Sequence, residues 1–134
     1  MIKRVAIAGC RDYTDYAQAK AYIDFCLSRI GQQYTIVIVS GGCRGADMLG
    51  ERYARENGLS VERYPAQWDK YGRSAGPVRN REMARRADYV ICFWDGKSRG
   101  TQSMIRYARQ LGKPVMVKAI HAAGGFSRGE NRRG

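Results

Sequence analysis

The sequence predicts an α/β fold built on a mostly parallel, doubly wound sheet of about five strands. Short runs of apolar and β-branched residues alternate with segments whose apolar residues recur at helical spacing. Glycines follow several of these runs, as they do in the turns that join strands to helices. The 134 residues fit one domain, because a chain of this length supports one core. We therefore expect one sheet and one principal site.

The chain begins with the pattern of a βαβ unit. Residues 5–8 and 34–40 are apolar runs that stop at glycine, which is typical of buried parallel strands. Between them, the apolar side chains of residues 17–30 recur at roughly helical spacing. Asp15 can cap the start of this helix, and Gly31 occurs where its end is expected.

The same alternation continues through three more strands. A helix over residues 46–57 ends at Gly58, and a weak strand follows at 59–64. The next helix opens at Gly76-Pro77, because proline suits the first helical turn. The remaining elements are a strand at 88–94, a helix at 101–111 that ends at Gly112, and a strand at 113–117.

The chain is strongly basic, with 24 Lys and Arg against 12 Asp and Glu and a formal charge of +12. Such an excess attracts phosphate in a free nucleotide, in nucleic acid or at a membrane surface, so charge alone does not choose among them. No apolar run approaches the ~20 residues that span a bilayer, and the first residues lead directly into a strand pattern. We expect a cytoplasmic protein with no membrane partner.

The cysteines indicate neither a metal site nor a disulfide framework. The four are far apart in the sequence, and His121 is the one imidazole in the chain. We expect reduced thiols, no bound metal and no cofactor. From His121 onward the sequence is rich in Gly, Ser, Arg and Asn, which predicts a flexible basic tail over residues 119–134.

Polar turns with glycines follow three of the expected strands. Ligands of open α/β sheets bind beyond the carboxyl ends of the strands. Glycine lets the backbone approach a ligand, and the first amides of the following helix are unpaired donors that suit phosphate. Glycine is also common in tight turns that bind nothing. The candidate ligand-binding residues in these turns are Gly9, Cys10, Arg11, Gly41, Gly42, Arg44, Gly45, Asp47, Gly96, Ser98, Gly100 and Thr101.

Arginines give the same edge a positive charge. Arg11, Arg44 and Arg79 are expected to point inward, because guanidinium groups match phosphate oxygens bidentately. Asn80, beside Arg79 in the first turn of its helix, joins the candidate set. The other cations of this edge are expected to be solvated: Lys70, Arg73, Arg81, Lys97 and Arg99.

Three side chains in and near these turns have alternative roles that the sequence leaves open. Trp68 and Tyr71 either stack on a nucleotide base or pin their loop to the body of the domain. Asp47 either accepts a hydrogen bond from a ribose hydroxyl or compensates the N-terminus of its helix.

Four motifs occur in order along the chain. They are Gly9-Cys10-Arg11-Asp12-Tyr13, the run at residues 40–47, Gly76-Pro77-Val78-Arg79-Asn80 and the run at residues 94–101. In this combination, residues 1–118 resemble the YspA/YpsA-related branch of the SLOG superfamily. The resemblance implies a nucleotide-binding domain with a Rossmann-like three-layer sandwich. Related domains often pair through their helices, so a homodimer is a further expectation.

The resemblance also implies roles for individual residues. Gly41, Gly42 and Gly45 resemble a phosphate-side turn, and Gly100-Thr101 resembles a second one. Arg79 is similar to an arginine of the related phosphoribohydrolases. Two departures follow: Cys10 replaces the usual serine of the first turn, and Met104 stands where those hydrolases carry a glutamate.

Three functions are compatible with these patterns. The first is the sensing or sequestering of a phosphorylated nucleotide or nucleotide-derived ligand, such as an adenine nucleotide or an ADP-ribose-like molecule. The second is a nucleotide N-glycosidase or phosphoribohydrolase. Because Met104 replaces the glutamate, binding is favoured over catalysis, and no catalytic residue is assigned. The carboxylates that could substitute for that glutamate are Asp47, Asp95 and Glu82.

The third function is nucleic-acid binding through the basic surface. It would be assisted by the arginines of the tail, Arg128, Arg132 and Arg133. Binding of this kind weakens steeply as salt rises, whereas a nucleotide held in a pocket is less sensitive.

Overall fold

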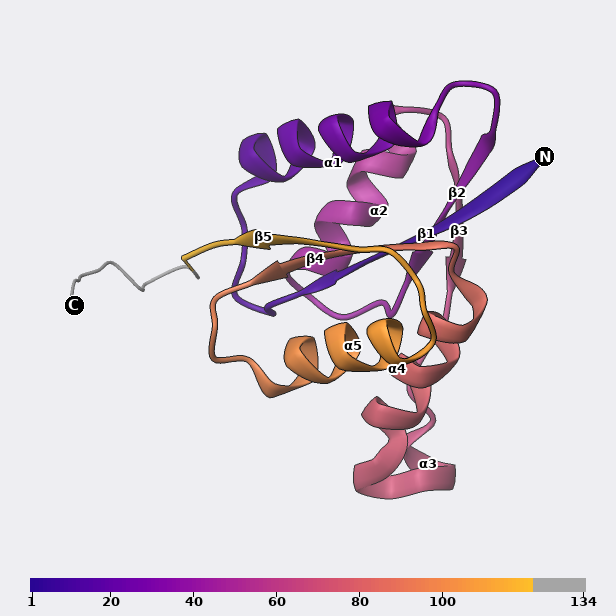
Figure 1. The fold of residues 1–134 in the computed structure, drawn as a ribbon. Coiled ribbons are helices and arrows are strands. Elements are labelled where there is room, and N and C mark those ends of the chain that lie inside the picture. Colours follow the sequence, from indigo (N-terminus) through magenta and orange to yellow (C-terminus); the bar gives the residue numbers. More distant parts are fainter. Residues whose placement is uncertain (122–134) are drawn as a thin grey trace.

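The computed structural model describes residues 1–121, which form a parallel sheet between two layers of helices (Figure 1). Its five strands are arranged in the order β3-β2-β1-β4-β5. Every strand pairing is parallel. The strands are β1 (Ile2–Gly9), β2 (Thr35–Ser40), β3 (Ser60–Arg63), β4 (Tyr89–Trp94) and β5 (Val115–Ala119). The predicted α/β sandwich is therefore confirmed, and the sheet is parallel throughout.

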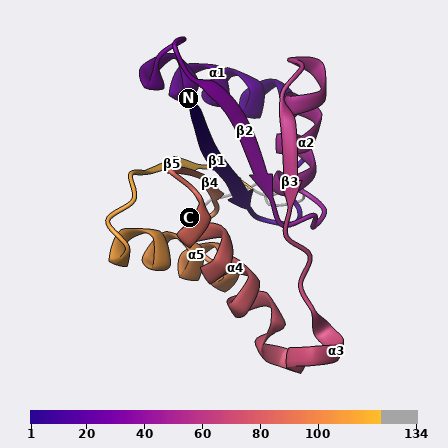
Figure 2. The same cartoon turned by 90° about the vertical axis from the view of Figure 1, so that its right-hand side faces the viewer.

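Two pairs of helices cover the two faces of the sheet (Figures 1 and 2). One layer comprises α1 (Tyr16–Ile30) and α2 (Ala46–Glu56), and the other comprises α4 (Ala75–Arg86) and α5 (Arg99–Gln110). Each face has its own core, since successive strand residues point to opposite sides. Ile7 and Ile38 belong to the first core, and their neighbours Ala6 and Val39 belong to the second.

Helix α1 starts and stops where the sequence predicts. The Asp15 carboxylate accepts a 3.0 Å hydrogen bond from the backbone N–H of Gln18, which caps the first turn. Gly31 follows the last residue with φ of 109°. In α4, Pro77 lies in the first turn, as expected.

The connection between β3 and α4 is more ordered than the sequence predicts. It contains a short helix, α3 (Trp68–Tyr71), and one 3₁₀ turn, η1 (Gly72–Ser74). Figure 2 shows this segment projecting from the body of the domain beyond the start of α4. The excursion places Trp68 and Tyr71 near the carboxyl edge of the sheet.

The last strand runs slightly past the expected domain boundary. β5 extends to Ala119, and Ile120 is buried against the first core. The boundary after residue 118 therefore falls inside this strand, and the rest of the expected tail, residues 122–134, lies outside the described part. Among the described helices, none has both the length and the apolar character needed to cross a membrane.

Candidate functional site

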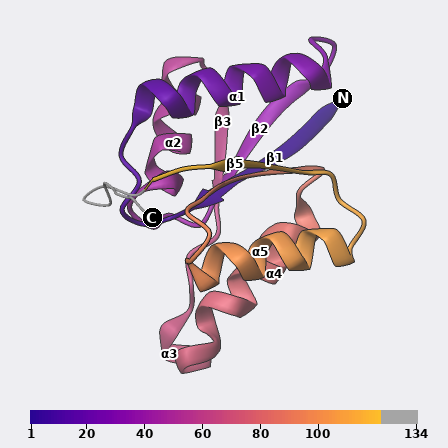
Figure 3. The same cartoon turned by 60° about the vertical axis from the view of Figure 1, so that its left-hand side comes forward.

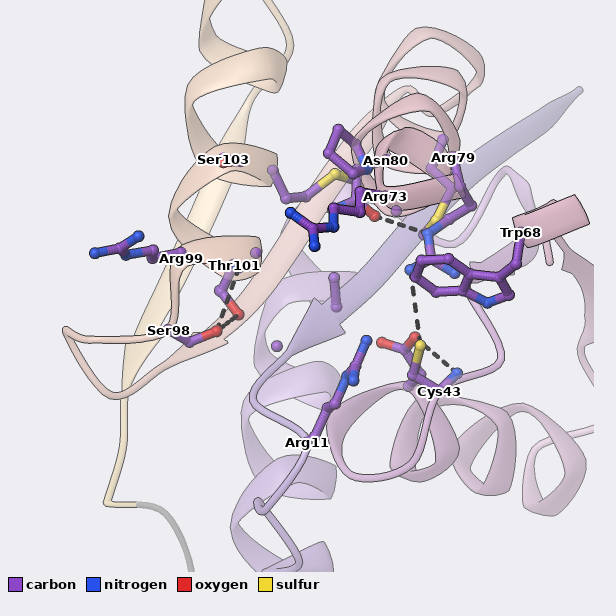
Figure 4. A pocket seen from close by; sticks show the side chains of 18 residues that line it. Arg11, Cys43, Trp68, Arg73, Arg79, Asn80, Ser98, Arg99, Thr101 and Ser103 are labelled. Atoms are coloured by element: carbon purple, nitrogen blue, oxygen red, sulfur yellow. Dashed lines mark hydrogen bonds between the residues drawn. The ribbon is translucent and has the colours of Figure 1, made fainter. Parts of the chain in front are cut away.

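A cavity of about 450 Å³ opens at the carboxyl edge of the sheet (Figure 4). The end of β1, the turn after β2, α3 and the first turns of α4 and α5 surround it. Parallel strands bring these separate segments to one edge. Nine of the predicted residues line it: Gly9, Arg11, Asp47, Trp68, Arg79, Asn80, Ser98, Gly100 and Thr101.

Arg79 is the most buried cation of the site, with 8% of its surface exposed. Its Nη1 donates to the carbonyl oxygen of Gly41 at 2.8 Å, and its Nε donates to Oδ1 of Asn80 at 2.8 Å. Its Nη2 lies 3.7 Å from Sγ of Cys43. All of its hydrogen-bond partners in the described chain are neutral. The guanidinium therefore lines the cavity without a direct ion pair to a carboxylate.

Asp47 is the one carboxylate among the residues that line the cavity. It is 7% exposed, and its Oδ2 accepts a 3.1 Å hydrogen bond from the backbone N–H of Cys43. Burial raises the pKa of Asp47 to about 6, against the opposing effects of that N–H and of the Arg79 and Arg11 charges. Asp47 is therefore mostly ionised at neutral pH and mostly protonated near pH 5.

Three backbone N–H groups in the turn after β2 have acceptors within the chain. The N–H of Gly42 donates to Oγ of Ser40 at 3.0 Å, and that of Ala46 donates to the carbonyl of Cys10 at 3.1 Å. Together with the bond from Cys43 to Asp47, these contacts leave three amides of the turn occupied. Of the first amides of α2, that of Ala46 is therefore already paired by the chain after β1, and Ser40 and Asp47 supply acceptors for Gly42 and Cys43.

The glycines of this turn are required by close packing. A Cβ on Gly41 would lie 2.8 Å from Nη1 of Arg79 and 2.9 Å from Oδ2 of Asp47. A Cβ on Gly45 would collide with the carbonyl oxygens of Cys10 and Arg11, and Gly45 also has a positive φ of 79°. Gly41, Gly42 and Gly45 do not themselves line the cavity. Gly41 leaves the space that Arg79 and Asp47 occupy beside the cavity.

The turn before α5 forms the opposite wall. Oδ1 of Asp95 accepts hydrogen bonds from the backbone N–H groups of Lys97 at 2.8 Å and Ser98 at 2.9 Å. Burial opposes the ionised form, but these N–H groups hold the pKa of Asp95 below its ordinary value. Oγ of Ser98 accepts from the N–H of Thr101 at 3.4 Å and so caps α5.

Several predicted residues lie elsewhere. Arg44, expected to point inward, is an exposed side chain that pairs with Asp12 at 3.3 Å. Cys10 is buried behind the rim, and Gly96 lies in the turn before α5 without lining the cavity. Tyr71 lines a different hollow, of about 340 Å³. Trp68 and Tyr71 are therefore not partners at one site.

Residues 3–71, just over half of the chain, match the YspA, cpYpsA-related SLOG family. The chain belongs to this family. A curated relative, the Gene 61 protein of Mycobacterium phage D29, is 37% identical over 121 residues, which cover 86% of this SLOG chain and 95% of the relative.

Solved structures share the fold of this SLOG domain. DNA processing protein A (DprA) from Streptococcus pneumoniae superposes with a TM-score of 0.66 at 20% identity, over 87% of this chain and 50% of that one. DprA from Helicobacter pylori is described for its binding of single-stranded DNA. It superposes with a TM-score of 0.60 at 25% identity, over 86% of this chain and 64% of that one. TM1055 superposes with a TM-score of 0.59 at 25% identity, over 86% of this chain and 72% of that one. The SLOG chain thus spans half to two-thirds of the two DprA chains.

The SLOG cavity also contains residues that the sequence analysis did not select. Arg73 and Arg99, expected to be solvated, are both exposed and both line the cavity; the Arg73 side chain points into it, and that of Arg99 extends away past α5 (Figure 4). Ala8, Met83 and Met104 give the cavity an apolar floor. Helical spacing from Gly100 could have identified Ser103 and Met104, but no sequence signal fixed the direction of Arg73. The cavity combines a cationic wall with an apolar base.

The described residues offer no site for a metal ion. No group of three or more His, Cys, Asp or Glu side chains lies close enough together among residues 1–121. All four cysteines are free thiols, and Cys43 is the one that lines the cavity. The chemistry of the site therefore comes from Arg11, Arg73, Arg79 and Asp47.

Proposed function

We propose that this SLOG domain binds a phosphate-bearing, nucleotide-type ligand in the 450 Å³ cavity and so senses or sequesters it. One observation carries the proposal: Arg79 is buried, lines the cavity and hydrogen-bonds to neutral groups within the described chain. A buried charge is costly unless an opposite charge meets it. A phosphate group supplies that charge and accepts a charge-assisted hydrogen bond from the guanidinium.

The other walls match the remaining parts of a nucleotide. Arg11 and Arg73 point into the same space as Arg79 and add positive charge around the phosphate (Figure 4). Trp68 stands at the rim with 55% of its surface exposed, so its ring is available to stack on a base. A volume of about 450 Å³ lies within the range of small-ligand pockets.

Asp47 supplies the acceptor that a ribose hydroxyl requires. Its Oδ2 is held by Cys43, whereas Oδ1 has no hydrogen-bond partner within residues 1–121. An ionised carboxylate accepts and does not donate, so Asp47 favours a ligand hydroxyl and disfavours a second anionic group at that point. We place the ribose near Asp47 and the phosphate near Arg79.

A thermal-shift panel tests the proposal. The panel contains AMP, ADP, ATP and ADP-ribose, with adenosine and ribose 5-phosphate as half-ligands. We expect at least one phosphorylated nucleoside to raise Tm more than either half-ligand, because phosphate and base contact different walls. If no phosphorylated nucleoside raises Tm at any concentration in the panel, the proposal fails.

Hydrolysis of an N-glycosidic bond is the second candidate function, and one observation favours it. A carboxyl group that lines a cavity with a pKa near neutrality is suited to proton transfer, and Asp47 has both properties. Against it, the buried thioether of Met104 faces the cavity where the related hydrolases carry a glutamate. Chromatography of nucleoside monophosphates after incubation decides: release of free base that disappears in Asp47→Asn supports hydrolysis, and no release discards it.

A further inference from the structure

The two helical layers of the domain differ strongly in charge. Helices α1 and α2 carry four basic and four acidic residues, so that layer is balanced. Helices α4 and α5 carry seven arginines and a single acidic residue, Glu82. The two layers lie on opposite faces of the sheet (Figure 3). The positive charge of the helices is therefore concentrated on one face of the molecule, away from the balanced one.

The arginines of this basic face are exposed and mostly unpaired. Arg81, Arg106 and Arg109 are exposed and form no salt bridge with any residue of the described chain, whereas Arg85 pairs with Glu82. On the balanced face, by contrast, Lys20 pairs with Asp24 and Arg52 pairs with Glu56, each at 3.0 Å.

The arginines of α4 and α5 meet across the two helices at Tyr107. The guanidinium carbon of Arg81 lies 5.0 Å from the centre of that ring, and that of Arg106 lies 5.8 Å from it. Cation–π contact uses the face of a guanidinium and leaves its N–H edge free for phosphate oxygens. Tyr107 thus holds Arg81 and Arg106 in place without neutralising their charges.

A groove of about 460 Å³ runs along the outer side of α5. It lies on the side of the helix opposite Gly100, Ser103 and Met104, which line the nucleotide cavity. Its lining combines apolar surface with two arginines and two glutamines, and comprises Trp94, Gln102, Ile105, Arg106, Arg109 and Gln110. Gln102, Arg106 and Arg109 occupy one helical stripe, because residues three and four apart are neighbours on a helix. The groove is therefore a concave surface, separate from the nucleotide cavity, with cationic and amide donors.

We infer that the outer face of α4 and α5, with the groove beside α5, binds nucleic acid through its phosphodiester backbone. Arginines that project from one face without acidic partners are the electrostatic footprint of such binding. Compensation of helix dipoles accounts for Arg85 and Arg109 in the last helical turns, but not for Arg81 and Arg106.

The same face is unsuited to a membrane surface. Interfacial helices insert large apolar side chains beside their basic residues. Neither α4 nor α5 has a large exposed apolar side chain, and the exposed Leu111 lies beyond the end of α5. Phosphodiester is therefore the polyanion that matches this surface.

The test compares two variants of the full chain with equal changes in charge. The face variant carries Arg81→Gln, Arg85→Gln, Arg106→Gln and Arg109→Gln. The control variant carries Lys20→Gln, Arg29→Gln, Arg52→Gln and Arg55→Gln on the balanced face. Fluorescence anisotropy with labelled single-stranded and duplex 20-mers is recorded over a salt series, and circular dichroism confirms that each variant is folded.

We expect the wild type to bind at low salt and the face variant to lose at least tenfold in affinity. The slope of log K against log salt should fall in magnitude by about 3, since each phosphate contact contributes roughly 0.7 to 0.9. The control variant should retain affinity within about threefold, because charges far from the contact are screened. The nucleotide-induced rise in Tm should be unchanged in the face variant, which separates this surface from the cavity.

Three results overturn the inference. The first is no binding of either 20-mer by the wild type at low salt. The second is an equal loss of affinity in both variants, which would reflect net charge and not this face. The third is binding to vesicles of phosphatidylserine and phosphatidylcholine that exceeds binding to the oligonucleotides and is lost in the face variant.

Discussion

Nη1 of Arg79, on α4, donates a 2.8 Å hydrogen bond to the carbonyl oxygen of Gly41, at the end of β2. This bond joins α4 to the turn after β2, two neighbouring segments at the candidate site, and it fixes the direction of the guanidinium. Gly41 permits it because a side chain at this position would occupy the space of Arg79 and Asp47.

Gly41→Ala should therefore disturb the site sterically. The added Cβ lies under 3.0 Å from Nη1 of Arg79 and Oδ2 of Asp47, so both groups must move. We expect a loss of about 1–3 kcal/mol in the free energy of unfolding, the usual cost of overpacking a tight site. Urea denaturation measures it. Gly100→Ala is the matched control, since its Cβ meets open space, and it should be neutral or slightly stabilising. Equal losses in the two variants would contradict this role for Gly41.

Asp47→Asn should change how stability depends on pH. Burial raises the pKa of Asp47 from 3.8 to about 6, so between these values the folded protein binds a proton that the unfolded chain does not. This group therefore lowers stability as pH rises from about 4 to 6. Relative to the wild type, Asp47→Asn should gain about 2–3 kcal/mol in unfolding free energy between pH 4 and pH 7.

Asp24→Asn is the control for the sign of this effect. The Tyr53 hydroxyl and Lys20 hold the pKa of Asp24 below its ordinary value. Its contribution to stability is present at neutral pH and is lost as pH falls through the folded pKa. The difference between wild type and Asp24→Asn should thus shrink in acid. Parallel pH profiles for the Asp24 and Asp47 variants would refute the assignment of a buried, raised pKa to Asp47.

Trp68→Ala should weaken binding of a nucleotide without weakening binding of ribose 5-phosphate. Stacking of a base on an aromatic side chain contributes about 1–3 kcal/mol, and the phosphate contacts lie on another wall. Tyr71→Ala should leave both affinities unchanged, because Tyr71 lines the neighbouring 340 Å³ hollow. For the wild type and Tyr71→Ala, quenching of tryptophan fluorescence during titration measures the affinity. For Trp68→Ala, calorimetry measures it. An unchanged nucleotide affinity in Trp68→Ala would show that the residue only holds its loop.

The sequence predicts the frame of the site well because that frame follows from local rules. Asp15 and Gly31 mark the limits of α1 through capping chemistry, and the strand ends meet at one edge because the sheet is parallel. Arg79 could be predicted to face inward from its position just after Pro77. These inferences need no knowledge of how distant side chains pack.

The direction of loop side chains could not be predicted, because it depends on partners far away in the sequence. Arg44 turns outward to Asp12, 32 residues before it. Two backbone donors after β2, those of Gly42 and Cys43, are taken by Ser40 and Asp47, which no spacing rule indicates. Arg73 faces the cavity because the α3 and η1 excursion carries it there, and the sequence predicted that segment only as a loop.

Calorimetric titration of a phosphorylated nucleoside into the wild type and into Arg79→Ala, at high salt, tests the central claim most directly. The account predicts saturable binding of one ligand per chain that persists in salt and weakens by about 1.5 to 3 kcal/mol in the variant, the worth of a charge-assisted contact. Arg44→Ala, which changes an exposed arginine outside the cavity, should bind as the wild type does. Equal affinity in Arg79→Ala and the wild type, or binding that vanishes with salt, would contradict a phosphate held by Arg79 in this cavity.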